Sequence, residues 1–573
     1  MDRIRFALWF GLLASVWISY TTWVTDNQPE RPPAAVSADG TDPEPTGPDA
    51  LDVMPTITVG DEALPTLDPG PADAGAVPAD VAAAATSARQ ITVTTDVLDL
   101  VIGLDGGDIV RAELPHYPVD KQNPDDPIRL LNDAPSDIWV FQTGLRSATG
   151  APDPNHREAF STAQSSYALA DGADTLEVRL DWTDASGLSA QKIFTFRRGE
   201  YRVDLELVLE NRGTETWRGA PYAQMLRYHT PPGRSFLDVD SYSFTGPAVY
   251  NGDSMEKLDV DDLREAPWTR QVANGWLASI QHHFLAALVP RRDEVSSLSA
   301  EAAPLPQALQ TAEDLRSYYL LRAIAPTADV PAGSRYSYPF ALFVGPKLQD
   351  QLEQTGQELE RTVDYGKLSF LSQPLFWLLD WVHGYVGNWG WAIVLVTIMI
   401  KLVFYKLTAT SGRSMAKMRK LAPRMKALQE KHKDDRQALS AAMMELYKKE
   451  KVNPAAGCLP ILIQMPFFFA FYWVLIESVE MRQAPFALWI SDLSVRDPFF
   501  ILPALMTGAM LFQMRLNPAP PDPVQAKVMQ IMPIAFGVMF AFFPAGLVLY
   551  WLTNTVFSIA QQWRINQLVA RES

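Results

Sequence analysis

The stretch WGWAIVLVTIMIKLVFYKL, residues 389–407, decides the fold class of this chain. It is apolar apart from Lys401 and Lys406. As a helix rising 1.5 Å per residue, a segment of this length crosses the ~30 Å hydrocarbon core of a bilayer. The stretch therefore predicts a membrane span, and similar runs elsewhere predict a polytopic membrane protein.

Other apolar runs bring the prediction to six transmembrane helices in total. They are Phe6–Thr25, Cys458–Ile476, Phe499–Met514 and Val528–Trp563, the last split into two short spans by Pro544-Ala545-Gly546. A cleaved signal peptide is the alternative for the first run, although no small-residue cleavage site follows closely. Loop 408–455 carries twelve Lys and Arg against five acids, so the positive-inside rule places it and both termini in the cytoplasm.

The 573 residues have a formal net charge of −17, and this charge is distributed unevenly between two parts of the chain. Residues 26–366 hold 53 acidic and 26 basic residues, whereas the rest hold 13 and 23. This segregation is typical of a membrane protein with a large polar domain outside, and it argues against specific nucleic-acid binding. Segment 26–90 has eleven prolines, twelve acids and two basic residues, which predicts a disordered acidic tether behind an anchor at 1–25.

The polar part and its connection to the membrane follow different periodicities. Residues 91–345 contain alternating runs such as 201–210, which predict an antiparallel β-sandwich. Segment 346–386 predicts a connecting helix at Pro346–Arg361 and then an amphipathic helix at the membrane surface, the alternative being an extension of the next span. The span itself is placed at 387–407, and 408–455 predicts a basic two-helix hairpin. Spans three to six occupy 456–563, and 564–573 form a short cytoplasmic tail.

Catalytic signatures are missing from the sequence. It has no Gly-rich phosphate loop, no His-Glu-x-x-His and no Gly-x-Ser-x-Gly, so neither an enzyme nor a bound cofactor or metal is expected. His282 and His283 adjoin in an apolar run that predicts a strand with the two side chains on opposite faces, a structural arrangement rather than a catalytic one. Cys458 is the one cysteine and suits helix packing.

Lys401 is the outstanding candidate for function. An ammonium near the middle of a span costs about 2.5–3.5 kcal/mol on insertion scales. It either extends to the cytoplasmic interface along its own stem or faces a hydrated cavity. Thr397, four residues earlier, continues a polar stripe on the same helix face, and Gln464 and Asn554 add polar groups from other spans. The second interpretation predicts a hydrophilic groove open towards the cytoplasm.

Several ordered motifs resemble those of the YidC/Oxa/Alb family of membrane protein insertases, in its Gram-negative form with a large periplasmic domain. They are DYG (364–366), SQPLF (372–376), VGNWG (386–390), SMAKMR (414–419), KVNP (451–454), QMPFF (464–468), QAPFALWI (483–490), FPAGLVLY (543–550) and, at the start of the β region, ITVTTDVLDL (91–100). The resemblance implies a five-span core behind an anchor span, and a periplasmic β-supersandwich. It also implies insertion of proteins into the inner membrane, alone or with the Sec translocon.

The resemblance also implies roles for individual residues. Lys401 stands where the family usually has the groove arginine, and Thr397 at the groove threonine, while Tyr550 and Trp551 stand at an aromatic pair that contacts substrate helices. Implied partners are nascent membrane proteins, the lipid bilayer, the ribosome and signal-recognition targeting factors. Because the tail carries only Arg564 and Arg571, ribosome contact falls instead to the hairpin, with Lys417, Arg419 and Lys420 as candidates.

Two alternatives from other classes remain open on the residues. A small-solute transporter would use Lys401 as a counter-charge, but the spans show no obvious inverted repeat and no second charged partner. A carbohydrate-modifying enzyme built on the β region would need paired acid and base groups in a cleft. Saturable solute uptake would favour the first, and sugar turnover by the isolated domain the second.

Overall fold

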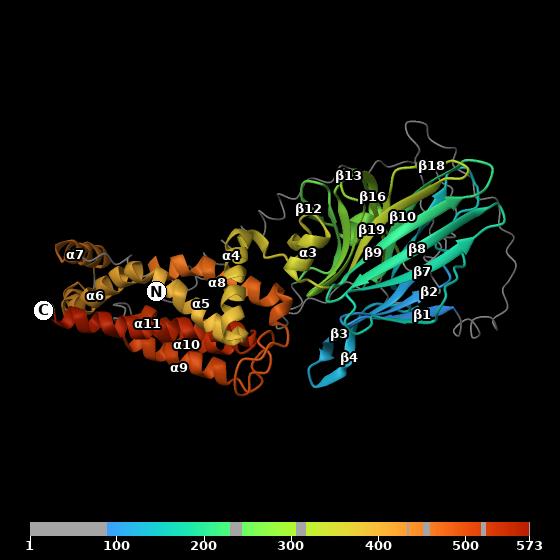
Figure 1. The fold of residues 1–573 in the computed structure, drawn as a ribbon. Helices are drawn as coiled ribbons and strands as arrows, with labels where there is room; N and C mark the ends of the chain where they lie inside the picture. Colours follow the sequence, from blue (N-terminus) through green and yellow to red (C-terminus); the bar gives the residue numbers. More distant parts are fainter. Residues whose placement is uncertain are drawn as a thin grey trace, which may run out of the picture.

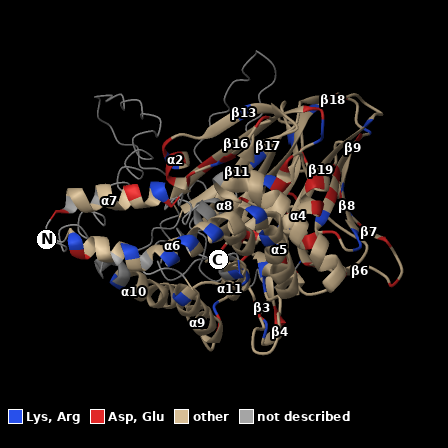
Figure 2. Cartoon of the chain, turned by 90° about the vertical axis from the view of Figure 1, so that its left-hand side faces the viewer, with Lys and Arg blue, Asp and Glu red and all other residues tan. Residues whose placement is uncertain are grey.

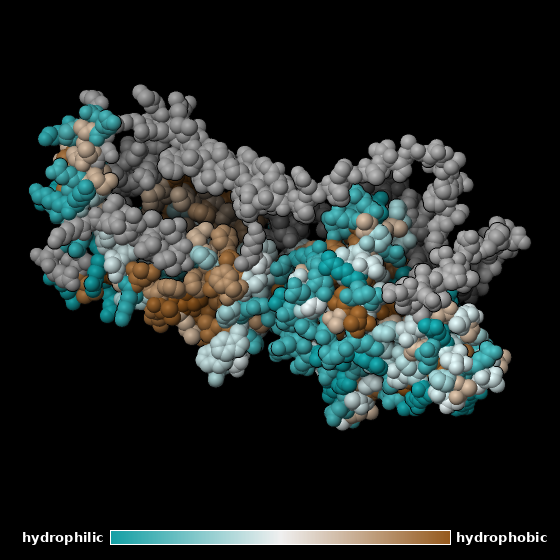
Figure 3. Space-filling view, turned by 90° about the horizontal axis from the view of Figure 1, so that it is seen from above, coloured by the Kyte–Doolittle hydropathy of each residue, from teal (hydrophilic) through white to brown (hydrophobic). Residues whose placement is uncertain are grey.

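The computed structural model describes residues 89–229, 243–304, 317–432, 435–450, 459–516 and 523–571. The predicted anchor at 1–25 and all but the last two residues of the predicted tether at 26–90 lie outside these ranges. The described residues form a β-rich part and a helical part that meet end to end (Figure 1). Figure 3 shows hydrophobic residues gathered on the helical part, whereas hydrophilic residues cover much of the β part.

The β-rich part contains a large, nearly all-antiparallel sheet of eleven strands in the order β13-β16-β17-β10-β5-β3-β2-β1-β6, with β18 on β10 and β4 on β3. Only the pairing of β1 with β6 is parallel among its described strands. Its strands are β1 (Gln90–Thr94), β2 (Asp99–Gly103), β3 (Asp108–Asp120), β4 (Asn123–Leu131), β5 (Trp139–Ser147), β6 (Ser166–Ala168), β10 (Trp217–His229), β13 (Trp268–Ala273), β16 (Val295–Pro304), β17 (Ser317–Ile324) and β18 (Ala328–Val330).

A second sheet of eight antiparallel strands has the order β12-β11-β14-β15-β19-β9-β8-β7. Its strands are β7 (Thr175–Thr183), β8 (Leu188–Arg197), β9 (Arg202–Asn211), β11 (Gly246–Tyr250), β12 (Met255–Lys257), β14 (Trp276–Gln281), β15 (Phe284–Val289) and β19 (Arg335–Pro346). One short helix, α2 (Val260–Glu265), leads into β13. In β8 every second side chain is buried, as the two-residue period predicts for a strand with one face in the core. The predicted strand at 201–210 is β9.

The predicted connecting helix at Pro346–Arg361 is wrong as one continuous element. The chain forms α3 (Gln349–Thr355) and then a separate 3-10 turn, η4 (Leu359–Thr362). Gly356 ends α3 in an extended conformation, and Glu358 takes a left-handed one with φ of 57°. Both conformations break the helical path, so the leucine spacing identified helical turns but not their interruption.

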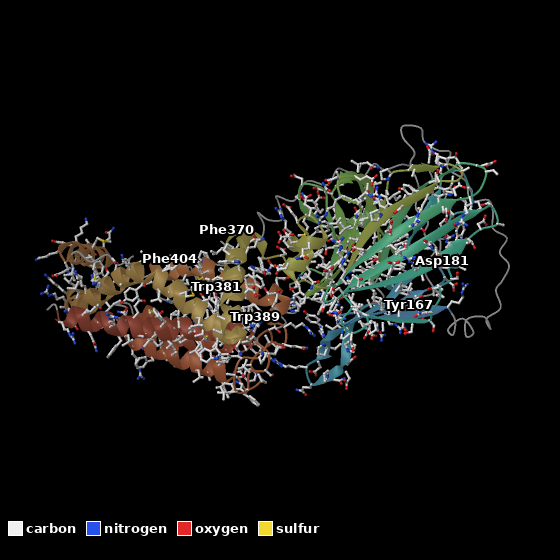
Figure 4. All side chains as sticks on the ribbon, in the orientation of Figure 1. Tyr167, Asp181, Phe370, Trp381, Trp389 and Phe404 are labelled. Carbon is white, nitrogen blue, oxygen red and sulfur yellow. The ribbon has the colours of Figure 1, made fainter. Side chains whose placement is uncertain are left out.

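The helical part begins with a turn and an amphipathic helix. Its described elements are η5 (Gly366–Leu368), α4 (Ser369–Val386), α5 (Trp389–Val403), α6 (Tyr405–Lys431), α7 (Arg436–Lys449), α8 (Leu459–Glu477), η7 (Val479–Met481), α9 (Ile501–Leu516), α10 (Pro523–Phe540) and α11 (Ala545–Arg571). On α4, Leu375 and Leu379 are buried while Phe370, Trp377 and Trp381 are exposed, which is the two-faced pattern of an amphipathic helix. Figure 4 labels Phe370 and Trp381 on this helix.

The predicted span at 387–407 is interrupted near its end. Helix α5 stops at Val403, and α6 starts at Tyr405 in a direction that differs by 66°. Figure 4 labels Trp389 and Phe404, which mark the two ends of α5. The composition changes at the bend, because α5 has Lys401 as its one charged residue whereas α6 carries eight basic residues and Glu430. The bend thus separates an apolar helix from a charged one.

Membrane-spanning capacity, judged by length and apolarity, is found in one place among the described residues. The segments Trp389–Val403 and Tyr405–Met418 meet the requirement together as a bent pair, whereas no single described helix meets it alone. Shorter apolar helices occur at Ile501–Leu516 and Lys527–Phe540. The predicted break around 544–546 corresponds to the end of α10 at Phe540 and the start of α11 at Ala545.

Candidate functional site

Lys401 lies in the last turn of α5 and is 4% exposed. Its Nζ donates a hydrogen bond of 2.7 Å to Ser558 Oγ on α11, and Ser558 in turn donates to the Asn554 carbonyl at 2.7 Å. No carboxylate within the described ranges lies within 4.0 Å of this ammonium. Lys401 therefore points onto another helix of the bundle.

Thr397 lies one turn before Lys401 and is 1% exposed. Its hydroxyl donates to the Ile393 carbonyl at 2.6 Å, a bond within its own helix. That bond satisfies the hydroxyl hydrogen while leaving the oxygen able to accept from another group. The two residues therefore form a polar strip in an otherwise apolar helix.

The remaining polar groups of this region come from α11. Gln561 donates through Nε2 to Thr408 Oγ1 at 2.7 Å and to the Tyr405 carbonyl at 3.2 Å, which ties α11 to the start of α6. Thr555, also on α11, is buried. The helices approach closely at Gly412, where a Cβ would lie 2.8 Å from Ile565 Cδ1. We call the set Thr397, Lys401, Asn554, Thr555, Ser558 and Gln561 the polar seam.

Sequence analysis identified Lys401, Thr397 and Asn554 of this seam but missed the other members. The signal was nonetheless present, since Asn554, Ser558 and Gln561 recur at spacings of four and three within the last apolar run. Residues at these spacings share one helix face. The helical spacing that links Thr397 to Lys401 on α5 could therefore have predicted a polar face on α11 as well.

The aromatic pair lies elsewhere on α11. Tyr550 is buried and stacks on Phe471 of α8, with ring centroids 4.4 Å apart. Trp551 contacts Phe468 of α8 at 5.0 Å and Phe540 of α10 at 5.2 Å. Seven residues separate Trp551 from Ser558, about 10 Å along a helix. The structure therefore places the pair in an aromatic cluster with α8 and α10, apart from the polar seam.

Gln464 does not join Lys401 by any hydrogen bond among the described residues. It is partly buried on α8, the helix that also supplies Phe468 and Phe471. Of the predicted groove residues, the structure thus groups Lys401 with Thr397, and Tyr550 with Trp551. Gln464 belongs to the helix of the second group.

The predicted hairpin residues lie on α6. Lys417 and Lys420 are exposed, and Arg419 lies between them within the same helix. Helices α6 and α7 pack through a small apolar cluster that contains Leu421, Met425, Met443 and Leu446, and the ion pair Arg424–Glu450 joins them at 2.7 Å. Figure 2 shows Lys and Arg residues spaced along α6. Basic charge is therefore displayed at the end of the molecule opposite to the β-rich part.

His282 and His283 do not lie in a strand as predicted. Gln281 pairs with Phe284, so the two histidines form the tight turn between β14 and β15, with their rings stacked 3.7 Å apart. His282 Nε2 lies 3.0 Å from the Ile476 carbonyl of α8, and burial lowers the pKa of His283 well below its usual value. Apolar residues on both sides concealed the turn from the sequence pattern. The pair therefore contributes to the contact between the two parts.

A buried ion pair marks the centre of this contact. Lys347, just after β19, lies 3.1 Å from Glu477 at the end of α8, and the two side chains are only 2% and 4% exposed. Glu477 also accepts a hydrogen bond from Ser243 Oγ at 2.8 Å. Tyr365 Oη and Ser478 Oγ lie 3.2 Å apart beside them. We call these residues the joint, since they fix the β-rich part onto the helical part.

Taken together, these features define a class: an antiparallel β domain caps a bundle of apolar helices in which, among the described residues, the buried Lys401 ammonium has a hydroxyl partner and no carboxylate within 4.0 Å. Comparisons with known proteins narrow this class. The family model of the YidC periplasmic domain matches residues 90–378, and that of the 60Kd inner membrane protein matches residues 381–572.

Curated relatives match along the whole chain. The membrane protein insertase YidC of Thioalkalivibrio sulfidiphilus is 44% identical over 100% of this chain and 99% of its own length, and that of Nitrosococcus oceani is 41% identical over 100% of both chains. The chain therefore belongs to the YidC family of inner-membrane protein insertases. A crystal structure of an active YidC insertase aligns over 83% of this chain and 92% of its own at 19% identity and a TM-score of 0.37.

Proposed function

We propose that this insertase acts through the polar seam, taking nascent membrane proteins from the cytoplasmic side and releasing them into the lipid. The proposal includes six spans, cytoplasmic termini, and action either alone or with the Sec translocon. The observation that carries it is Lys401, a buried ammonium held by the Ser558 hydroxyl with no carboxylate close to it among the described residues. A buried charge without an opposite charge lowers the stability of the fold. We infer that Lys401 is kept despite this cost because an anionic group of the client protein pairs with it during insertion.

The polar N-tail of a client would enter the seam from the side of α6 and be drawn towards Lys401. Two unit charges 4 Å apart attract by about 4 kcal/mol at an effective dielectric constant of 20, and by less if water enters. The membrane potential favours outward movement of an acidic tail by ~2.3 kcal/mol per charge per 100 mV. Neither contribution requires a nucleotide or a bound cofactor.

The hydrophobic segment of the client would leave along α8 and α10. These helices expose Met465, Phe469, Ile531, Met532 and Ile534 next to the aromatic cluster of Tyr550 and Trp551. Methionine and phenylalanine adapt to apolar surfaces of differing shape, which suits clients of varied sequence. Transfer of the segment into lipid, worth about 25 cal/mol for each Å² removed from water, would drive release.

Delivery would use the basic hairpin. Lys417, Arg419 and Lys420 lie on α6 at the end of the molecule away from the β domain. A ribosome or a signal-recognition targeting factor presents anionic surface, and exposed Lys and Arg attract such surfaces over about one Debye length, ~10 Å at 0.1 M salt. The hairpin therefore offers a cationic surface to either partner.

Reconstitution tests the proposal. The purified chain in liposomes should insert a single-span client, detected by protease protection, whereas protein-free liposomes of the same composition should insert markedly less. Adding or omitting nucleotide should leave the yield unchanged. Equal yields with and without the protein would overturn the proposal that the protein inserts clients without the Sec translocon. Only a role together with the translocon would then remain.

A further inference from the structure

A cleft lies at the boundary between the two parts, away from the polar seam. It is bounded by the tip of the β3–β4 hairpin and by the segment that leads from η7 to α9, and its volume is about 1130 Å³. Lys121 at the hairpin tip donates to the carbonyls of Gln483 and Ser491, both at 2.7 Å, and Arg482 donates to the Pro118 carbonyl at 2.9 Å. Figure 1 shows this hairpin reaching towards the helical part.

The cleft has a net positive charge, to which both parts of the protein contribute. Four basic side chains line it against two acidic ones, Asp120 and Asp492. Within the described ranges Lys121, Arg482 and Arg496 form no ion pair. The hydrogen bonds that Lys121 and Arg482 donate go to backbone carbonyls. Lys121 and Arg129 come from the acidic stretch 26–366, whereas Arg482 and Arg496 come from the remainder, which carries more base than acid.

The cleft is continuous with an apolar surface. Val495 and Pro498 line it, and the next residues, Phe499 and Phe500, are 65% and 46% exposed. Exposed apolar side chains continue along α9 at Leu505 and Phe512. A helix face of this kind suits contact with lipid chains, so the cleft opens at the level where headgroups begin.

We propose that this cleft binds the headgroup of an anionic phospholipid from the outer leaflet of the membrane. The phosphodiester would accept hydrogen bonds from Arg496 and from the remaining N–H groups of Lys121 and Arg482, and the acyl chains would lie along α9. A lipid fits better than a free phosphate because charge and apolar surface adjoin in the order found within one lipid molecule. Arginine suits the phosphate because its planar fork offers two parallel donors.

The full chain in detergent, mixed with equal amounts of phosphatidylglycerol and phosphatidylcholine, provides the test. Native mass spectrometry should show preferential retention of phosphatidylglycerol. Arg496→Gln should reduce that preference by about fivefold through the loss of one charge-assisted contact, while Arg496→Lys should keep most of it. Arg335→Gln, at the far end of β19, is the matched control and should behave like the wild type.

Each other result would overturn the proposal. Equal retention of both lipids by the wild type would exclude an anionic preference, and an equal loss in Arg496→Gln and Arg335→Gln would exclude this cleft. Displacement of the retained lipid by millimolar glycerol phosphate would indicate a site for free phosphate compounds, and displacement by an acidic peptide a site for client segments. Melting temperatures of the variants would reveal an effect that is due to unfolding.

Discussion

At the scale of single residues, Lys401 combines burial with an incomplete set of partners. Replacing it with leucine removes a charge that, among the described residues, hydrogen-bonds to the Ser558 hydroxyl, so the fold should lose no stability. Insertion of a client with an acidic N-tail should nevertheless fall by about tenfold, because ~1.4 kcal/mol of attraction corresponds to that factor. Insertion yield in vesicles, measured beside the melting temperature, separates the two effects.

Two comparisons make this prediction specific. Lys401→Arg should retain insertion because the charge remains, and a matched client with a neutral tail should be affected less by Lys401→Leu than the acidic one. Equal yields for all three proteins and both clients would refute a role of the charge. A melting temperature that falls in step with the yield would indicate a structural role instead.

Glu480, on η7 and two residues after Ser478 of the joint, makes the stability of the fold depend on pH. Burial, with contributions from Asp380 and Asp350, raises the pKa of this carboxyl from 4.5 to about 7, against the opposing effect of Lys347. A carboxyl with a raised pKa stabilises the folded state fully below its unfolded pKa, and this stabilisation is lost as pH rises through about 7. The melting temperature of the wild type should therefore fall between about pH 5 and pH 8 by a few degrees more than that of Glu480→Gln. Parallel curves for the two proteins would contradict the assignment.

The sequence disclosed the members of the site that stand out against their surroundings. Lys401 is conspicuous because a charge interrupts an apolar run, and Thr397 follows from helical spacing. The spacing of Asn554, Ser558 and Gln561 marks a polar face on α11, but only the structure shows that this face meets Lys401 on α5. The joint was inaccessible for a different reason: Lys347 and Glu477 are 130 residues apart, and neither interrupts a pattern.

At the scale of elements, the α6–α7 hairpin is held together by a small apolar cluster and one exposed ion pair. Reversing the charges of Lys417, Arg419 and Lys420 to glutamate should therefore leave its fold intact while weakening binding to ribosomes or targeting factors. The loss should be larger at low salt, because screening already weakens the wild-type attraction at high salt. Co-sedimentation with ribosomes across a salt series provides the measurement.

A second charge-reversed variant controls for the change in total charge. Arg212, Arg218 and Arg335 lie in the β domain, so their reversal alters net charge equally without altering the hairpin. Unchanged binding of the hairpin variant at every salt concentration would show that its basic side chains are only a hydrated surface. An equal loss in both variants would show that net charge, and not the hairpin, controls the attraction.

Some element boundaries coincide with a change in composition, whereas others occur where only the backbone changes direction. Helix α5 starts at Trp389, where the apolar run begins, and the gap between α10 and α11 contains Pro544 of the predicted break. The bend at Phe404 and the turn at His282 and His283 occur among apolar residues without Gly or Pro. Their positions depend on which surface each helix or strand packs against, and a single sequence does not contain that information.

At the scale of the whole molecule, side chains of the β domain attach it to the helices at two places among the described residues. The buried Lys347–Glu477 pair is one attachment, and the hydrogen bonds of Lys121 and Arg482 beside the basic cleft are another. Removing one partner of a buried pair typically costs about 3–5 kcal/mol. Lys347→Met should accordingly lower the melting temperature, and Lys347→Met with Glu477→Met should recover part of the loss. Failure of the double variant to recover any of it would show that the pair is not the cause.

A deletion of residues 91–340 that retains 346–361 tests whether the insertion of client proteins requires the β domain. The deletion keeps Lys347 and Glu477 but removes Lys121 and the Pro118 carbonyl, so segment 482–498 loses hydrogen bonds worth ~1 kcal/mol each. Protease cleavage in that segment should rise by about tenfold as its local opening becomes easier. Insertion should persist, because the polar seam lies between α5, α6 and α11 and receives no side chain from the described β domain. Complete loss of insertion by a deletion protein whose helices remain folded would show that the β domain takes part in the reaction itself.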